Sequence, residues 1–438
     1  MSSKRQFDLI VIGNGSAGDN IARTLGRRGL NVAIVEREHL GGECLNDGCI
    51  PSKALVHIAK TAPATPWPRV VASIRETQAL VRGGQPDGGF QADGVTLFWG
   101  EAVFRGPREV EVAGDLLTAR DVVIATGTAP GLPPIPGLAE VRPLTNRGIF
   151  SMEALPERLA IIGGGPIGLE LGQALRRLGA EVTIYEAASR VASTEEPDVS
   201  AEIARVLTAE GVRIVEGAAI NAVHGSPEGP IEIESAAGRE PYAHLLVAAG
   251  RVAQVPDGLV SLGLELDRRG YVAISRCGRT NLPGLWAAGD VTGRFAFTHY
   301  AGYQAHHIAR HIQEDSCDPI PDTTVPWAIF TDPEIGHAGM TEQQARDAGH
   351  RLKIGHLDAA ELDWFRTTAA TSGFARVIAD ADTGHLLGAH FICDRASTIV
   401  GEAALAIQHR LTARQVASTI HPYPTASELF RWACAKAV

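Results

Sequence analysis

Cys44 and Cys49 are the two residues whose type and spacing point most directly to chemistry, with four residues between them in GGECLNDGCIPSKAL. In a reducing compartment such a pair is typical of catalysis or metal binding rather than of a structural disulfide. Residues five apart in a regular helix have Cα atoms about 8.6 Å apart, whereas a disulfide needs at most about 6.8 Å. A disulfide therefore requires tighter winding, which Gly48 allows. Two unpaired thiols, or half of a metal site, remain the alternatives, although no second Cys/His pair at zinc spacing follows.

Two features around this pair favour a reactive dithiol. Pro51 suits the first turn of a following helix, where its missing N–H costs little, and a cysteine at a helix start has a lowered pKa. The other cysteines are scattered, at positions 277, 317, 393 and 434. Six cysteines in 438 residues are too few for a disulfide scaffold, and a reducing compartment would not keep one.

The elements that must position this dithiol are set by an internal repeat. The segment DLIVIGNGSAGDNIARTLGRRGLNVAIVE recurs as RLAIIGGGPIGLELGQALRRLGAEVTIYE, 150 positions later. Gly13, Gly15, Gly18 and Glu36 thus correspond to Gly163, Gly165, Gly168 and Glu186. Each copy predicts a strand, a glycine-rich turn, an amphipathic helix and a second strand that ends in Glu.

This unit has the pattern of a dinucleotide-binding site. The first glycine makes the tight turn, the second lets the backbone approach a pyrophosphate, and the third packs the helix on the strand. The terminal acid accepts a hydrogen bond from a ribose hydroxyl. Two such units predict two bound dinucleotides. In the second unit, Glu186 would repel a 2′-phosphate, which favours NADH over NADPH, although Arg190 lies close enough in the sequence to weaken that preference.

Composition excludes several classes of protein. The chain carries 40 basic and 50 acidic residues, a net charge of −10, with 45% hydrophobic residues, as in globular proteins with roughly three domains. Without a basic stripe, we expect no nucleic-acid partner. Without a long apolar run or a secretory signal, we expect no membrane contact and a cytoplasmic location.

Further motifs extend the pattern along nearly the whole chain. GGECLNDGCIPSK resembles the redox motif GGxCxNxGCxPSK of the class I flavin-dependent pyridine nucleotide–disulfide oxidoreductases. DVVIATGTAPGLPPIPG resembles the ATG segment of that family, TNLPGLWAAGD its flavin-binding TxxPxxxAxGD, and VPWAIFTDPEIGHAGMTE the start of its dimerisation domain. The family includes dihydrolipoamide dehydrogenase, glutathione reductase and mercuric reductase.

The resemblance implies an α/β fold with two Rossmann-like domains, for FAD and NAD, and a C-terminal α+β dimerisation domain. It implies an FAD domain over 1–140 and 270–320, an NAD domain over 141–269 and an interface domain over 321–438. The expected FAD contacts are Gly13, Gly15, Ser16, Ala17, Gly18, Glu36, Gly42, Lys53, Ala102, Thr126, Gly127, Gly289, Asp290, Thr298 and His299. The expected NAD contacts are Gly163, Gly165, Pro166, Ile167, Gly168, Glu186 and Gly250.

The resemblance also implies catalytic roles. Cys49 would be the charge-transfer thiol near the flavin and Cys44 the thiol that exchanges with substrate. Lys53 would lie by the flavin and pair with Glu170. The active site would be shared across a homodimer, with Tyr423 and Glu428 facing the Cys44 of the other subunit.

One departure bears on the substrate. Family members that reduce disulfides end in HPTxSE, where a His from the partner acts as acid–base and Glu orients it. This chain reads HPYPTASE, which puts Tyr423 in place of that His. A phenol is a poor base at neutral pH, so thiol oxidation should suffer most. His421 could substitute, since it shares a face with Tyr423 in an extended chain, although a structural role for His421 is the simpler interpretation.

Mercuric reductases also carry Tyr at this position, and Glu43 before the first cysteine likewise favours a mercuric-reductase-like branch. The vicinal C-terminal cysteines of that enzyme are missing, since only Cys434 is present. The hypotheses are therefore a reductase of a small disulfide or a thiol-binding metal ion, dihydrolipoamide dehydrogenase, mercuric reductase, or a slow-cycling flavoprotein redox sensor. His306, His307 and His311 have partial metal-ligand spacing, but without a third convergent ligand we expect no resident metal site there.

Overall fold

The computed structural model describes residues 4–84, 88–227 and 229–438, and its contacts divide the chain into two compact units. The first unit comprises the chain up to Ala54 together with Val71–Gly131 and Gly250–Ile320. The second comprises Leu55–Val70, Leu132–Ala249 and Pro321–Val438. The predicted three-domain boundaries stay a prediction.

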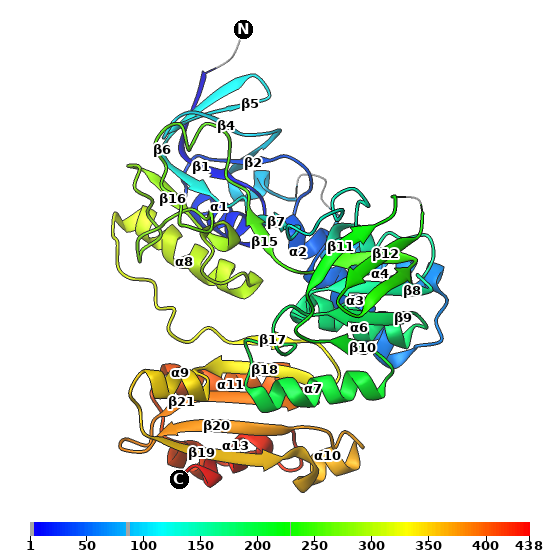
Figure 1. Cartoon of the computed structure of the whole chain (residues 1–438). Helices are drawn as coiled ribbons and strands as arrows, with labels where there is room; N and C mark the ends of the chain where they lie inside the picture. The colour runs from blue at the N-terminus through cyan, green and yellow to red at the C-terminus, as the bar shows by residue number, and fades with distance from the viewer. Residues whose placement is uncertain (1–3, 85–87, 228) are drawn as a thin grey trace. The chain divides into compact units, whose positions relative to one another are not determined.

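The first unit is built on one seven-stranded sheet (Figure 1). Its strands run in the order β3 (Val95–Trp99), β2 (Val32–Glu36), β1 (Lys4–Ile12), β6 (Asp115–Ile124), β5 (Glu109–Val112), β4 (Val103–Gly106), and β16 (Leu285–Ala287) pairs with β6. The pairs among β1, β2, β3, β6 and β16 are parallel. Parallel strands are covered on both faces, which is why residues 32–35 of β2 and residues 9–12 of β1 are unbroken apolar runs.

The helices of this unit carry the dithiol. They are α1 (Ser16–Gly26), α2 (Gly42–Asn46) and α8 (Thr298–Glu314), together with α3 (Cys49–Thr61) up to Ala54 and α4 (Trp67–Arg82) from Val71 on, and short 3-10 turns lie at Gln91–Asp93 and Gly289–Thr292. α1 packs against α8, and its buried residues Ile21, Ala22 and Leu25 belong to the same hydrophobic core as Ala305 and Ile308 of α8. A small ribbon pairs β7 (Thr128–Pro130) with β15 (Arg251–Ala253).

The described residues of the second unit form three sheets. The parallel sheet runs β10 (Arg213–Val215), β9 (Glu181–Tyr185), β8 (Arg158–Ile162), β14 (His244–Val247), with helices α5 (Asn146–Ile149), α6 (Pro166–Arg177) and α7 (Pro197–Ala209). An antiparallel sheet joins β11 (Ile220–His224), β12 (Ile231–Ser235) and β13 (Gly238–Tyr242).

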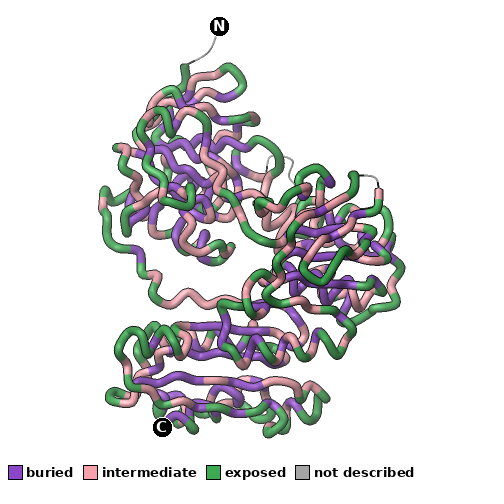
Figure 2. The backbone as a smooth tube through the Cα atoms, viewed as in Figure 1, coloured by how far each residue is buried: buried purple, intermediate pink, exposed green. Residues whose placement is uncertain are grey.

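The third sheet of this unit is antiparallel and C-terminal. It runs β17 (Trp327–Ile329), β18 (Glu334–Gly339), β21 (Leu386–Cys393), β20 (Phe374–Asp380), β19 (Leu352–Asp358). It is accompanied by α9 (Glu342–Asp347), α10 (Asp363–Thr367), α11 (Ala396–Gln408), α12 (Ala413–Ser418), α13 (Glu428–Lys436) and a 3-10 turn at Ala359–Glu361. In each unit the buried residues follow the central strands (Figure 2).

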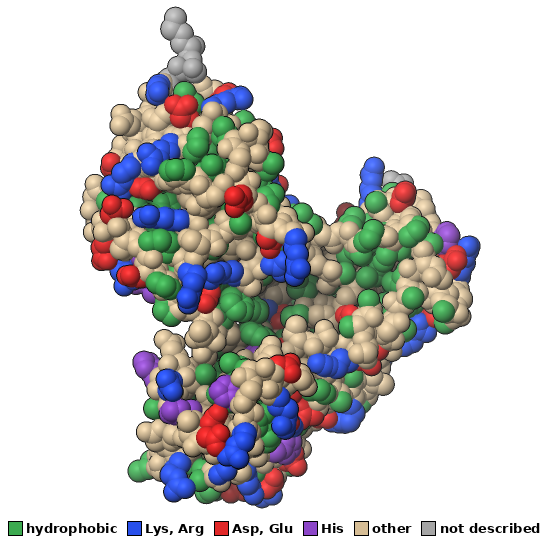
Figure 3. Space-filling model, turned by 60° about the vertical axis from the view of Figure 1, so that its left-hand side comes forward, with side chains coloured by type: hydrophobic (Ala, Val, Ile, Leu, Met, Phe, Trp, Pro, Cys, Tyr) green, Lys and Arg blue, Asp and Glu red, His purple; other side chains and the backbone are tan. Residues whose placement is uncertain are grey.

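The fold prediction is confirmed. β1, α1 and β2 form the first predicted strand–helix–strand unit, β8, α6 and β9 form the second, and the C-terminal segment is α+β. On the face drawn in Figure 3, basic and acidic side chains are interspersed.

Cys277 and Cys317, two of the cysteines that are scattered in the sequence, are joined in the fold. They form a disulfide with their Cα atoms 5.1 Å apart, within the usual range. Helix α8 ends at Glu314 and the chain then returns toward Cys277, whose carbonyl oxygen lies 3.2 Å from Nδ1 of His311 on that helix. The bridge thus joins positions 40 apart in sequence, and this long separation hides the pair from a search for motifs.

We predict that this disulfide stabilises the first unit. In the chain-entropy account, closing a loop of this length contributes about 4 kcal/mol, so a Cys277→Ser/Cys317→Ser variant should unfold at lower urea concentration than the oxidised protein. Dithiothreitol should lower the midpoint of the natural chain by more than that of the variant, which keeps only the Cys44–Cys49 pair to reduce. Equal midpoints for the oxidised protein and the variant would contradict the prediction.

Candidate functional site

The turn after β1 has the geometry of a phosphate-binding loop. Gly13 has φ +99°, and a Cβ on Gly18 would lie 1.9 Å from the Gly13 carbonyl oxygen, so only glycine permits this approach of helix to strand. A Cβ on Gly15, in contrast, would have no described atom within 4 Å. Glu36 at the end of β2 is buried and accepts a hydrogen bond from the backbone N–H of Asn14 at 2.8 Å. Open space at the second glycine, at the start of a helix, fits a dinucleotide pyrophosphate.

The turn after β8 repeats this geometry in the second unit. Gly163 has φ +113°, a Cβ on Gly168 would lie 1.9 Å from the Gly163 oxygen, and one on Gly165 would have no described atom within 4 Å. Glu186 accepts from the N–H groups of Gly164 and Ala188, both at 2.6 Å. Each unit therefore holds one site that fits a dinucleotide.

Other predicted cofactor residues lie on nearby elements of their units. Ser16 and Ala17 begin α1, Pro166 and Ile167 begin α6, and Thr298 and His299 begin α8. A Cβ on Gly42 would lie 2.6 Å from the Gly15 Cα, so α2 begins against the phosphate-binding loop. Thr126 and Gly127 follow β6, Ala102 precedes β4, Gly250 precedes β15, and Gly289 and Asp290 follow β16. Their cofactor contacts stay predictions.

The dithiol lies at the junction of two helices. Cys44 is in α2 and Cys49 begins α3, with Pro51 in its first turn. A Cβ on Gly48 would lie 3.0 Å from the Glu43 oxygen and 3.2 Å from the Cys44 Cα, so this glycine lets the chain close up between the thiols. The Cys49 sulfur also lies 3.3 Å from the Thr298 hydroxyl at the start of α8.

The pKa values of the two thiols are shifted in opposite directions. The pKa of Cys49 is lowered to about 6, first by the hydrogen bond from Cys44 and then by Thr298 and the Lys53 ammonium, against the effect of burial. The same hydrogen bond, together with burial, raises the pKa of Cys44. At neutral pH Cys49 is therefore the thiolate and Cys44 holds the shared proton.

Arg251 links the dithiol segment to the rest of the first unit, and the sequence interpretation missed it. Its guanidinium forms an ion pair with Glu43, the neighbour of Cys44, and donates to the Thr128 hydroxyl at 2.6 Å. Its Nε also lies 4.0 Å from Asp290. Burial lowers the pKa of Arg251 and raises that of Asp290. Arg251 and Glu43 are 208 positions apart in the sequence, and only folding brings them together.

In the second unit, Tyr423 and His421 differ in their surroundings. The Tyr423 residue is 71% exposed, and its hydroxyl donates to Asp363 at 2.8 Å. That acceptor raises the pKa of the phenol, so Tyr423 holds its proton at neutral pH. The His421 side chain is 5% exposed, with its nitrogens 2.8 Å from Glu402 and 3.0 Å from the Thr419 oxygen. The carboxylate of Glu428 accepts from the Thr425 N–H at 3.3 Å.

Glu170 and the histidines of α8 complete the predicted set. Glu170 accepts from the Phe330 N–H at 2.9 Å, and its pairing with Lys53 stays a prediction. On α8, the ring centroids of His307 and His311 are 6.4 Å apart, and His311 faces a backbone carbonyl.

Two glycine-rich dinucleotide sites and a coupled dithiol define the class of a flavin- and pyridine-nucleotide-dependent disulfide oxidoreductase. The chain belongs to the pyridine nucleotide-disulphide oxidoreductase family, whose pattern matches residues 7–305, while the dimerisation domain of that family matches residues 325–434.

Relatives and solved structures agree with this membership. The chain is 32% identical over 446 residues to dihydrolipoyl dehydrogenase of Chlamydia pneumoniae, which covers 97% of this chain and 96% of that one. It is 32% identical over 447 residues to mercuric reductase of Bacillus cereus, which covers 96% of this chain and 70% of that one. The HOCl-induced flavoprotein disulfide reductase RclA from Escherichia coli superposes with a TM-score of 0.89 at 28% identity, over 97% of this chain and 99% of that one.

The predictions of family, fold and enzyme class are thus confirmed. Within the part of the chain that the structure describes, no helix combines the length and apolar character needed to cross a membrane.

We predict that the Cys44 thiol sets the reactivity of Cys49. In the reduced enzyme, alkylation of Cys49, followed by mass spectrometry, should slow as the pH falls through about 6. Cys44→Ala should move that midpoint upward, because it removes the largest stabilisation of the thiolate, and Lys53→Met should move it upward by less. Lys60→Met, which removes an ion pair with Asp332 and Asp394, serves as the control. An unshifted midpoint in Cys44→Ala would refute the coupling.

Proposed function

We propose that this enzyme oxidises NADH and uses the Cys44–Cys49 dithiol to reduce a small disulfide or a thiol-binding metal ion. The observation that carries the proposal is the coupled thiol–thiolate pair beside a phosphate-binding loop. Bound FAD would supply two-electron transfer from the nicotinamide to a disulfide. Gly15 and Glu36 would hold it in the first unit, and Gly165 and Glu186 would hold NADH in the second.

The dithiol performs the exchange. Cys44 loses its proton as its sulfur attacks one sulfur of the acceptor, which breaks the acceptor S–S bond and forms a mixed disulfide, and the first leaving thiolate takes up that proton. The Cys49 thiolate then attacks the Cys44 sulfur, releases the second product thiolate and closes the Cys44–Cys49 disulfide. Two cysteine sulfurs are oxidised and two acceptor sulfurs are reduced, and the proton of Cys44 ends on a product thiol.

Tyr423 of a second copy is the proposed proton donor to the leaving thiolate. Its ring is exposed, and its raised pKa keeps the proton on the hydroxyl at neutral pH, so Tyr423 holds a proton to donate but is a poor base, whereas proton removal from an incoming thiol needs a base. His421 is less suited, because its ring is buried and both of its nitrogens face acceptors in its own chain. The site therefore favours reduction of an acceptor over oxidation of a dithiol substrate.

A metal ion as the acceptor has its own support. The Bacillus cereus mercuric reductase is as similar to this chain as the dihydrolipoyl dehydrogenase is. RclA has also been solved as a Cu(II) complex, with a TM-score of 0.88 and 26% identity to this chain. The two acceptor classes share one requirement, which is a nucleophilic thiol at Cys44 backed by a second thiol.

The test is NADH oxidation by the purified enzyme with lipoamide, glutathione disulfide, Hg(II) and Cu(II) as parallel acceptors. Turnover with a disulfide or a metal ion supports the proposal, and loss of that turnover in Cys44→Ser places the dithiol on the route. Flavin that NADH reduces and that stays reduced for minutes with every acceptor would instead favour a redox sensor.

We predict that Tyr423 limits the thiol-oxidising direction. Tyr423→His should speed the oxidation of dihydrolipoamide by NAD⁺ by at least about tenfold, because general base catalysis typically contributes that much or more. Tyr423→Phe should slow the reduction of disulfides, and Tyr303→Phe on α8 serves as a control. Steady-state kinetics in both directions measure this. An unchanged rate in Tyr423→His would remove Tyr423 from the proton path.

We predict that Glu186 sets the preference for NADH. A hydrogen bond to a charged group contributes about 1.5–3 kcal/mol, so Glu186→Gln should lower the ratio of kcat/KM for NADH to that for NADPH by roughly tenfold or more. Arg190 does not oppose this, since its guanidinium donates to the carbonyl oxygens of Ser193 and Glu195. Glu181→Gln, at the start of the same strand, should leave the ratio unchanged. A constant ratio in Glu186→Gln would overturn the assignment.

A further inference from the structure

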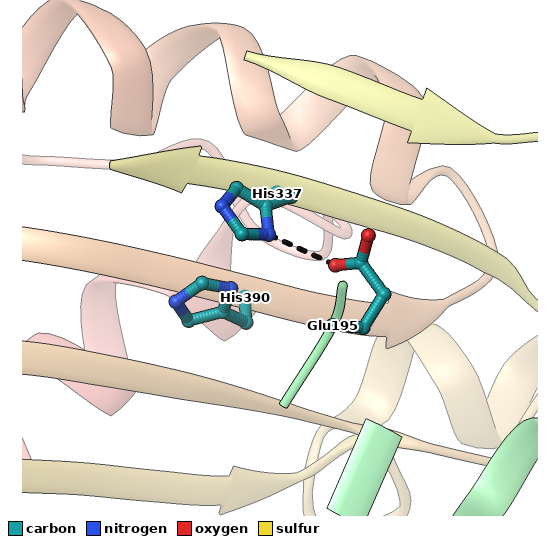
Figure 4. Close-up of side chains that lie close together, drawn as sticks. All are labelled: Glu195, His337 and His390. Atoms are coloured by element: carbon teal, nitrogen blue, oxygen red, sulfur yellow. Dashed lines mark hydrogen bonds and ion pairs between the residues drawn. The ribbon is translucent and has the colours of Figure 1, made fainter. Parts of the chain in front are cut away.

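A second group of chemistry-bearing side chains lies in the second unit, apart from the dithiol and the dinucleotide loops. Glu195 lies between β9 and α7, while His337 on β18 and His390 on β21 are directly paired across neighbouring antiparallel strands (Figure 4). All three residues are buried, with 1%, 1% and 0% exposure for the Glu195, His337 and His390 residues. One oxygen or nitrogen from each lies within 4.8 Å of the other two.

The partners of the two rings determine which nitrogens carry hydrogen. His337 Nε2 lies 3.1 Å from the Gly339 carbonyl oxygen, and His390 Nε2 lies 2.9 Å from the Met340 carbonyl oxygen. A carbonyl oxygen only accepts, so Nε2 donates in both rings. In the neutral ring, each Nδ1 therefore presents a lone pair.

Neither lone pair has a hydrogen-bond donor opposite it among the described residues. His337 Nδ1 lies 2.9 Å from Glu195 Oε2, so two electron-pair donors face each other and a cation must lie between them. His390 Nδ1 is buried and has no hydrogen-bond partner among the described residues. A proton between His337 and Glu195 would satisfy that pair but not His390, whereas one metal ion satisfies all three atoms.

The surroundings orient the three groups as ligands. The Trp327 indole N–H donates to Glu195 Oε1 at 2.7 Å, which leaves Oε2 to face the histidines. The Trp327 ring also stacks on His337, with centroids 3.5 Å apart. Histidines that bind metals usually donate their other N–H to a carbonyl or a carboxylate, and here both do.

We propose that Glu195, His337 and His390 form a binding site for a divalent transition-metal ion of the zinc type. Two imidazoles and one carboxylate are a donor set that zinc favours, and a fourth position is left for water. Tetrahedral ligands on such an ion lie roughly 3.4 Å apart, so the widest pair closes by up to roughly 1.4 Å through motions shared by the three side chains.

The charges around the cluster, and the loop and strands that it joins, suit a structural metal ion. Glu195 offsets one positive charge, and Glu196, whose carboxylate lies 3.7 Å from His390 Nε2, offsets the second. The ion would tie the loop after β9 to two strands of the C-terminal sheet. Arg190 donates to the Glu195 carbonyl oxygen, so the same loop runs back toward the dinucleotide site at Glu186.

The test measures zinc in holoenzyme produced in zinc-supplemented medium, after the dithiol has been oxidised and loosely held metal removed by dialysis. We expect about one zinc per chain by mass spectrometry of the metal, and X-ray absorption that shows nitrogen and oxygen ligands without sulfur. His390→Gln is the informative variant, because its amide can still donate to the Met340 oxygen while the Nδ1 ligand is lost. Its zinc content should fall at least about tenfold.

His350→Gln is the matched control, since His350 is paired with Asp380 at 2.7 Å in the same unit but lies outside the cluster; it should keep its zinc. Zinc should also raise the thermal midpoint of the natural chain and not that of His390→Gln. Absence of zinc from the natural chain, sulfur ligands, or equal zinc content in His390→Gln would each overturn the proposal. Flavin content shows that the variants are folded, and no outcome depends on the electron acceptor.

Discussion

The close approach of a helix to the turn before it is the constraint on which both halves of this enzyme depend. A side chain at Gly18 or Gly168 would overlap the carbonyl oxygen of the glycine that opens the same turn, at 1.9 Å in both cases. With glycine there, α1 and α6 begin directly behind the strands, and their free N–H groups face the open space at Gly15 and Gly165. The first of these turns also fixes α2, since Gly42 packs on Gly15. The position of the dithiol thus follows from a phosphate-binding loop.

The dithiol is arranged so that the protein itself divides the roles of its two sulfurs. The thiols share one proton, and three neighbours on different elements, Cys44, Lys53 and Thr298, stabilise the charge on Cys49. Arg251 and Glu43 neutralise each other beside Cys44, so no uncompensated charge from that pair acts on the exchange thiol. One sulfur is therefore kept as a thiolate and the other as the carrier of the proton.

A cluster of buried polar side chains lies in the second unit. Glu195, His337 and His390 are withdrawn from water, and polar groups in that position need partners. Trp327 and two carbonyl oxygens supply some of them, and the remaining lone pairs converge. Because these groups come from a loop and two strands, any ion they hold also fastens those elements to each other.

The sequence alone determined the family, the two dinucleotide-binding units, the C-terminal α+β domain and the candidate dithiol, because glycine spacing, apolar periodicity and the CxxxxC pair are local signals. The sequence placed Tyr423, rather than His421, at the position of the family's catalytic His only by alignment with the HPTxSE motif. Tertiary structure decided which residues that are distant in the sequence come into contact. It joined Cys277 to Cys317, brought Arg251 to Glu43, and paired His337 with His390 across strands. These contacts join residues 40, 208 and 53 positions apart, and such pairings depend on how strands and helices pack rather than on any repeat in the chain.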